Sequence, residues 1–362
     1  MNKWLFPKLW QNICFEETVC FYTDENGIEK GGSLLYEPLK IESMTSWDES
    51  VQFTENNDFV IEGNVIKRLE NSKIPLMQFD VFSHTNDGNI SYQWLCNDNG
   101  TRYIKPFNEI YKYQIKVTYT TESEGMFGSK IVDASLNKTI YKLQRKKPVN
   151  ILFYGDSITA GWEASGQNED VINKDDLTKK HEGSNRYPFM PAWPQLVVDA
   201  LKEHFDYDDI FKINRSASGS TSEWGAESAE RLIKDTNPDL AIVAFGMNNM
   251  SISPEKYKQE VDKIITNIRM LANKSEILLI SPMVANYDMI RSFKNEKTVD
   301  HERCLYELSR EYEGVFVLPI NNIFRNIEKR KGYMSLTGNC INHPNDYSVR
   351  IYAQAILELF GI

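Results

Sequence analysis

The feature that most constrains this chain is a change of sequence pattern near residue 147. After it, short apolar runs alternate with longer amphipathic stretches. The runs have the length and composition of buried parallel strands, and they are NILFY (150–154), IFKIN (210–214), LAIVAF (240–245), EILLI (276–280) and VFVLP (315–319). Strands that alternate with helices through right-handed crossovers build a three-layer, doubly wound α/β fold. We therefore expect a parallel sheet with helices on both faces.

The amphipathic stretches between these runs have the period of helices. In residues 254–272 the apolar side chains recur on one helical face, namely Tyr257, Val261, Ile264, Ile265, Ile268 and Leu271. A similar pattern predicts helices over 191–205, 299–313 and 345–360.

The residues before 147 have a different pattern, without a helical period. Runs rich in β-branched and aromatic residues are separated by turn sequences such as NDGN (86–89) and NDNG (97–100). The runs are SLLYEPLKIESM (33–44), VQFTE (51–55), DFVIEGNVIKRL (58–69), ISYQWL (90–95) and YQIKVTYTT (113–121). We expect a β-sandwich or jelly-roll-like domain over residues 1–146, linked through QRKKP (144–148) to an α/β domain over 147–362.

Length and charge agree with two domains and argue against two kinds of partner. A chain of 362 residues fits two domains of about 100–200 residues each. Its 41 basic and 51 acidic residues leave a formal net charge of −10. Because such a surface repels phosphate backbones and anionic lipids, we expect neither nucleic acid nor a membrane as partner. The oligomeric state stays open.

The cysteines and the N-terminus favour a cytoplasmic protein. The five cysteines are widely spread and lack the paired spacing of a disulfide framework or a zinc site (Cys14, Cys20, Cys96, Cys304 and Cys340). Polar residues and Pro7 interrupt the apolar core that a signal peptide needs. No apolar run reaches the ~18 residues of a membrane-spanning helix.

Four short motifs fall where an α/β fold binds its ligands. GDSIT (155–159), NRSASGSTS (214–222) and GMNN (246–249) follow the first three apolar runs, and NHPND (342–346) precedes the last predicted helix. In open α/β sheets, ligands bind at the carboxyl ends of the strands. The motifs therefore predict one site at this edge of the sheet.

The residue types in these motifs suit acyl transfer. A serine hydroxyl becomes a strong nucleophile when a base takes its proton, so Ser157 and His343 are candidates for nucleophile and base. The tetrahedral intermediate needs hydrogen-bond donors, which the N–H groups of Ser157 and Gly219 and the side-chain amide of Asn248 would supply. Asp156, beside the serine, is expected to brace the turn.

Each of these residues taken alone also fits a purely structural role. Ser157 would cap a helix, and His343 would lie at a helix start or on the surface. Gly219 would permit a positive φ angle, and Asn248 would satisfy turn backbone. The hypothesis of a catalytic site depends on the four residues occurring together in this order.

The four motifs resemble those of the SGNH hydrolases of the GDSL type, a family named after its serine, glycine, asparagine and histidine. The resemblance covers residues 149–362 and implies a flavodoxin-like catalytic domain, with Ser157 as nucleophile, His343 as base, and Ser157, Gly219 and Asn248 forming the oxyanion hole. Asn249 stands where the family most often has aspartate. No metal or cofactor is expected, and the remaining histidines lack the spacing of metal ligands.

One departure from the family concerns the orientation of His343. The family usually has an aspartate three residues before the histidine, and here that position is Cys340. Either Ser157 and His343 act as a dyad, or another acceptor holds the second ring nitrogen. A backbone carbonyl, Asn339 and Asp346 are the candidates. In either case activity should fall as the pH drops through the histidine range.

Further sequence similarity indicates a substrate class. The segments TGNCINHPND (337–346), PFMPAWPQLV (188–197) and STSEWG (220–225) are similar to a group of bacterial two-domain esterases. Many members of that group remove acetyl groups from glycans, and related enzymes carry a jelly-roll domain ahead of the catalytic one. The resemblance therefore implies an acetylated carbohydrate as substrate. The alternatives are a general short-chain esterase, lysophospholipase or thioesterase, an acyltransferase, and a non-catalytic carbohydrate-binding protein.

Four further residues are candidates for substrate binding. Trp162 and Trp224 follow the first and second motifs, and each would either stack on a sugar ring or pack in the core or a lid. The polar segment 163–187 is long for a strand–helix connection, which is typical of a functional loop. We interpret it as an active-site lid, with His181 and Arg186 as candidate substrate contacts.

Overall fold

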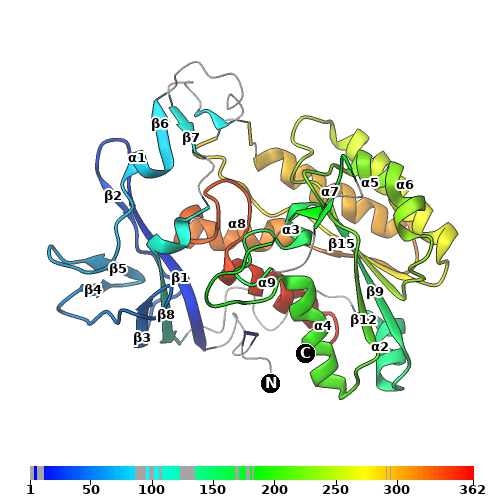
Figure 1. Ribbon diagram of the computed structural model, residues 1–362, viewed down its shortest axis with the longest axis horizontal. Helices are drawn as coiled ribbons and strands as arrows, with labels where there is room; N and C mark the ends of the chain where they lie inside the picture. Colours follow the sequence, from blue (N-terminus) through cyan, green and yellow to red (C-terminus); the bar gives the residue numbers. More distant parts are fainter. Residues whose placement is uncertain are drawn as a thin grey trace.

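An antiparallel β region lies beside a larger α/β region, with helices α8 (Ile320–Lys331) and α9 (Asp346–Glu358) between them (Figure 1). The computed structural model describes residues 4–5, 12–85, 95–97, 102–105, 108–122, 135–167, 171–176, 180–181, 183–290, 292–293 and 295–362. The two regions follow one another along the chain, but the last helices of the chain contact both of them.

The main sheet of the β region has four antiparallel strands. Their order across the sheet is β2 (Glu29–Gly31), β1 (Ile13–Thr23), β8 (Gln114–Thr120) and β3 (Lys40–Ser46). Two smaller pairs are β4 (Phe59–Glu62) with β5 (Val65–Arg68), and β6 (Ser83–Thr85) with β7 (Arg102–Ile104). In β8, buried residues alternate with half-buried ones, whereas the middle of β1 is buried at every residue. β1 is therefore covered on both of its faces.

The α/β region contains a parallel sheet of five strands. The strand order is β12 (Ile210–Asn214), β9 (Val149–Gly155), β14 (Leu240–Ala244), β15 (Glu276–Ile280) and β16 (Val315–Leu318). All four pairings are parallel. Along the chain, β9 is the first of these strands and β12 the second. β12 lies at one edge of the sheet next to β9, and β14, β15 and β16 follow in order on the opposite side of β9. This order is the doubly wound, flavodoxin-like arrangement.

Helices cover both faces of the parallel sheet, because alternate strand residues point to opposite sides. The first face, which includes Leu152 and Tyr154, packs against α5 (Ser222–Ile233), α6 (Pro254–Leu271) and α7 (Asn295–Glu311). The second face, which includes Ile151 and Phe153, packs against α4 (Trp193–Phe205), α8 and α9. These are the three layers that the sequence predicts.

The core of the second face continues into the β region. Val19 and Ile115 of the antiparallel sheet belong to the same buried cluster as Phe324 of α8 and Val349 of α9. A fully buried ion pair between Glu17 of β1 and Lys331 of α8 lies within this interface. The β region is thus packed onto the helices that flank His343.

The sequence prediction of the fold class is confirmed, and its differences from the structure lie in the β region. The longest strand, β1, was not predicted, because its sequence ICFEETVCFYT places two glutamates within an apolar run. The expected strand 51–55 contributes only isolated bridges at Gln52 and Glu55. Residues 90–94 of another expected strand lie outside the described residues. The domain boundary near residue 147 stays a prediction, and helix α2 (Asn137–Gln144) before it hydrogen-bonds to Glu276 of the parallel sheet.

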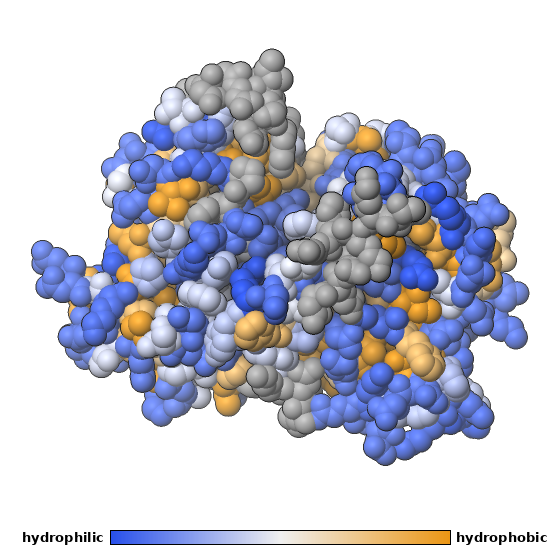
Figure 2. Space-filling model, in the orientation of Figure 1, coloured by the Kyte–Doolittle hydropathy of each residue, from blue (hydrophilic) through white to orange (hydrophobic). Residues whose placement is uncertain are grey.

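The surface is mostly polar on the face drawn in Figure 2, where hydrophobic residues form small separate groups. Such scattered apolar residues are normal for a protein surface. Within the described residues, no helix combines the length and the apolar composition needed to span a membrane.

Candidate active site

Ser157 lies at the carboxyl end of the central strand β9, on the turn that starts the short helix α3 (Ser157–Ala160). The Asp156 carboxylate caps this helix by accepting the Ile158 N–H at 3.0 Å. Gly155 is required in the turn, since a Cβ atom there would lie 2.4 Å from the Ala244 carbonyl oxygen. Asp156 therefore braces the turn, and burial raises the pKa of its carboxyl to about 7.

His343 reaches the serine from the loop before α9. Its Nε2 lies 2.8 Å from Ser157 Oγ, a hydrogen-bond distance. Two earlier residues of the same loop fix the backbone of His343. The His343 carbonyl oxygen accepts the Gly338 N–H at 2.8 Å and the Thr337 hydroxyl at 3.2 Å. Burial lowers the pKa of the imidazole to about 4, so the ring is neutral at pH 7.

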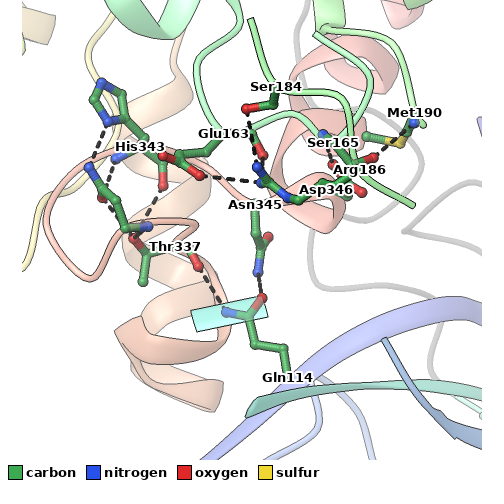
Figure 3. A network of polar contacts seen from close by, with 11 residues as sticks. Gln114, Glu163, Ser165, Ser184, Arg186, Met190, Thr337, His343, Asn345 and Asp346 are labelled. Atoms are coloured by element: carbon green, nitrogen blue, oxygen red, sulfur yellow. Dashed lines mark hydrogen bonds and ion pairs between the residues drawn. The ribbon is translucent and has the colours of Figure 1, made fainter. Parts of the chain in front are cut away.

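Of the two side chains proposed to orient His343, the structure brings only Asn339 to it. Asn339 Nδ2 lies 2.6 Å from His343 Nδ1. Asp346 instead accepts the Ser165 N–H at 2.8 Å (Figure 3), and among the described residues no hydrogen bond joins it to the histidine. Cys340, at the position where the family has aspartate, has its side chain in the apolar core.

The motifs that carry Gly219 and Asn248 adjoin the serine turn. The hydroxyl of Ser220 donates to the Gly155 carbonyl oxygen at 3.2 Å, and Asn248 Nδ2 donates to the Ser220 carbonyl oxygen at 2.9 Å. Gly219 has a φ of +70° and an exposed backbone. Two hydrogen bonds thus link the loops of the three strands, and all four motifs meet at one edge of the sheet.

Comparison with known protein families matches residues 153–350, more than half of the chain, to the GDSL-like lipase/acylhydrolase family. This chain is a member of the GDSL-like lipase/acylhydrolase family. The resemblance seen in the four motifs is confirmed. A search of curated proteins gives no match to the sequence.

Several solved structures are similar to this GDSL-like protein. A two-domain esterase active on acetylated mannans shares 18% identity at a TM-score of 0.46, over 62% of this chain and 52% of its own. The acetylxylan esterase Axe2 from Geobacillus stearothermophilus shares 19% identity at a TM-score of 0.45, over 59% of this chain and 94% of its own. An α/β hydrolase named LAE5, from the metagenome of Lake Arreo, shares 16% sequence identity at a TM-score of 0.46, over 59% of this chain and 95% of its own. The match thus spans about half of the two-domain esterase.

The four candidate substrate contacts of this GDSL-like protein lie in different surroundings. The half-buried Trp162 ring stacks on the His343 ring with centroids 6.1 Å apart, and the Trp162 backbone N–H donates to the Ser157 carbonyl oxygen at 3.1 Å. Trp224 donates its indole N–H to the Lys174 carbonyl oxygen at 3.3 Å and packs against Tyr154. His181 pairs with Val171 in a short strand, and its side chain is not described.

Arg186 is bonded within its own loop and also contacts the β region. Its guanidinium hydrogen-bonds to the Glu163 carbonyl oxygen and to Ser184 (Figure 3), and it lies over the Tyr111 ring of the β region. Burial raises the pKa of the Glu163 carboxyl to about 7, although Arg186 opposes that shift. The expected lid 163–187 is described only in part, and its two ends are tied together by this pair.

Sequence reasoning missed the contribution of the β region to this site. Gln114 Nε2 donates to the Thr337 carbonyl oxygen at 2.8 Å, and Gln114 Oε1 accepts from Asn345 at 3.2 Å (Figure 3). Gln114 Nε2 also donates to the Met334 carbonyl oxygen at 3.0 Å. A glutamine that begins a β-strand gives no sequence signal for such contacts. Among the described residues, no group of three or more histidine, cysteine or acidic side chains could hold a metal ion.

Proposed function

We propose that this chain is a serine esterase that removes O-acetyl groups from carbohydrates, with Ser157 as nucleophile and His343 as base. The observation that carries the proposal is the 2.8 Å contact between Ser157 Oγ and His343 Nε2. Ester hydrolysis is the reaction class of the family to which the chain belongs. The contact has the geometry expected for a nucleophile and its general base.

In the first half of the reaction, Ser157 Oγ attacks the ester carbonyl while its proton passes to His343 Nε2. The negative charge that develops on the carbonyl oxygen is stabilised by the N–H groups of Ser157 and Gly219 and by the Asn248 amide. One N–H of that amide is used by the Ser220 carbonyl, and the same nitrogen carries a second. The imidazolium then gives its proton to the leaving sugar oxygen.

In the second half, water attacks the acetyl-serine and loses a proton to His343 Nε2. Collapse of the second tetrahedral intermediate returns that proton to Ser157 and releases acetate. In each tetrahedral intermediate the positive charge of the imidazolium is balanced by the negative charge of the oxyanion, and no metal or cofactor takes part in the proposed steps.

Two observations support a short acyl group. Ser157 is only 6% exposed, and the Trp162 ring against His343 narrows the approach on that side. An acetyl group needs less room beside the serine than the chain of a lysophospholipid or a long-chain thioester. The preference for a carbohydrate rests on the sequence resemblance to two-domain esterases.

The experiment is acetate release from 4-nitrophenyl acetate, acetylated xylan and acetylated mannan. Ser157→Ala should lower turnover by at least about 10³-fold, because it removes the nucleophile. Ser83→Ala is the matched control, since that hydroxyl is buried in the β region without a hydrogen-bond partner among the described residues. Faster hydrolysis of long-chain 4-nitrophenyl esters would favour a general esterase. Turnover unaffected by Ser157→Ala would refute the proposal.

A further inference from the structure

The side-chain amide of Asn339 has its orientation fixed by the loop it sits in. Its Oδ1 accepts the backbone N–H groups of Ile341, Asn342 and His343 at 3.0, 3.0 and 3.1 Å. A flipped amide would turn its NH₂ group toward these three donors and leave all of them unpaired. Since a buried unpaired donor costs about 1–3 kcal/mol, the observed orientation is strongly preferred.

The orientation of this amide determines which nitrogen of His343 carries the proton. With Oδ1 held by the backbone, it is Nδ2, a donor, that lies 2.6 Å from His343 Nδ1. A neutral imidazole has one N–H and one acceptor nitrogen. Nδ1 must be the acceptor here, and the proton is then on Nε2, which faces Ser157 Oγ at 2.8 Å.

We propose that Asn339 is a positioning residue that holds neutral His343 in the Nε2–H tautomer, so that the resting enzyme is restrained from acyl transfer. The proposal rests on the proposed function, because it concerns the same serine and histidine. The proposal implies that acyl transfer in the wild-type site is slow and that one substitution would make it faster.

The restraint follows from the proton balance of the first step. To accept the Ser157 proton, Nε2 must have a lone pair, so the ring proton has to be on Nδ1. In that tautomer, and in the imidazolium that forms next, Nδ1–H and the Asn339 NH₂ group are two donors facing each other at hydrogen-bond distance. In serine proteases, an asparagine in place of the orienting aspartate lowers kcat about 10⁴-fold through the same wrong tautomer.

The acidic groups near this loop do not relieve the restraint. Asp346 is bonded to Ser165, and Glu163 is paired with Arg186. Cys340 is buried in the core, and burial raises the pKa of its thiol well above the ordinary value. Among the described residues, Asn339 is the side chain that contacts Nδ1.

The first test is direct observation of the tautomer by ¹⁵N NMR of the histidine-labelled full chain near pH 7.5, where His343 is neutral. Loss of one set of signals in His343→Gln assigns the ring among the five histidines. We expect a protonated Nε2 and an unprotonated Nδ1. The opposite pattern in the wild type would overturn the proposal, and this measurement needs no activity.

The second test is Asn339→Asp, which keeps the size of the side chain and an acceptor for the three backbone N–H groups. Its second oxygen would accept a hydrogen bond from Nδ1–H and so favour the tautomer whose Nε2 is free to take the serine proton, and kcat for 4-nitrophenyl acetate should rise by about 10²–10⁴-fold. The NMR signals should show Nδ1–H, and the acid limb of the pH profile should move to higher pH. An unchanged kcat in a folded Asn339→Asp variant would refute the proposal.

Two controls separate this proposal from the proposed function. Asn342→Asp adds the same charge beside His343 but keeps an acceptor for the Asn339 NH₂ group, which Asn342 Oδ1 accepts at 3.3 Å. Asn339 then still donates to Nδ1, and kcat should change by less than about threefold if the tautomer is the cause. Ser157→Ala combined with Asn339→Asp should abolish the gain. If that double variant keeps the activity, the serine mechanism fails, whereas the NMR result still decides the tautomer.

Discussion

The buried ion pair between Glu17 and Lys331 gives a sharp prediction about what holds the β region to the helices. Both side chains are completely shielded from solvent. The Glu17 carboxylate also accepts the Tyr119 hydroxyl at 2.7 Å and the Leu35 N–H at 2.8 Å, and Lys331 donates to the Thr18 carbonyl oxygen at 2.7 Å. Burial lowers the pKa of the Lys331 ammonium, and its contact with Glu17 opposes that shift. Lys331→Met keeps the bulk of the side chain and removes the compensating charge.

The size of the effect follows from what the remaining carboxylate can do. Breaking a buried pair by removing one partner typically costs about 3–5 kcal/mol. The Thr18 carbonyl oxygen also loses the donor that Lys331 supplies. We therefore expect Lys331→Met to lower the free energy of unfolding by about 3–5 kcal/mol at pH 7.

The assay is urea unfolding of wild type and variants at pH 7, followed by circular dichroism. Glu17→Gln combined with Lys331→Met removes both charges and should recover most of the loss, since neutral replacement of a buried pair is often tolerated. A loss below about 1 kcal/mol at pH 7 would refute the reasoning. A double variant less stable than Lys331→Met would refute it as well.

The remaining predictions concern the active site and the stability in acid. The structure replaces the sequence-based expectation of a fall through the ordinary histidine range, because burial lowers the pKa of His343 to about 4. Wild-type kcat/KM should stay flat from about pH 5 to 8 and fall by half near pH 4, which a pH–rate profile measures. Asn248→Ala should lower kcat about 10²–10³-fold, and a loss under about threefold would remove it from the oxyanion hole. Burial lowers the pKa of His301 to about 4, so the unfolded chain takes up a proton on this residue at a higher pH than the folded chain does. Up to about 3 kcal/mol of stability is therefore lost as the pH falls from about 6.5 to about 4. His301→Phe should reduce that loss, measured by urea unfolding at about pH 6.5 and about pH 4. Gln114→Leu leaves two buried carbonyl oxygens without their donor, which should lower the free energy of unfolding by about 1–3 kcal/mol and reduce kcat more than it raises KM.

The α/β region could be predicted from sequence because its signals are local. Each buried parallel strand is a continuous apolar run, and 210–214 and 276–280 coincide with β12 and β15. The β region was harder, because its strand β1 is buried on both faces and yet contains Glu17. A charged residue in a strand normally indicates a solvent-facing side. Here its partner Lys331 lies 314 positions away, beyond the reach of any local pattern.

In the candidate site, too, the sequence predicts some features and leaves others open. The motifs order Ser157, Gly219, Asn248 and His343 along the chain, and strand polarity brings the first three to one edge of the sheet. His343 reaches that edge from the loop before α9. The support of His343 depends on side-chain directions that the sequence leaves open. Asn339 and Asp346 were equal candidates on sequence, and only the loop geometry separates them, because it places Asp346 on the Ser165 N–H.

The same geometry explains why an aspartate at the family's usual position would not serve in this loop. Cys340 has a φ of +64°, its carbonyl oxygen accepts from Asn286 at 2.7 Å, and its side chain is completely buried in the apolar core. A carboxylate there would be buried among apolar side chains instead of contacting His343. The residue that faces the imidazole is one position earlier, at Asn339. In the proposed mechanism the orienting position has therefore moved by one residue along the chain, and because an amide occupies it, the proton of the proposed base is held on the other ring nitrogen.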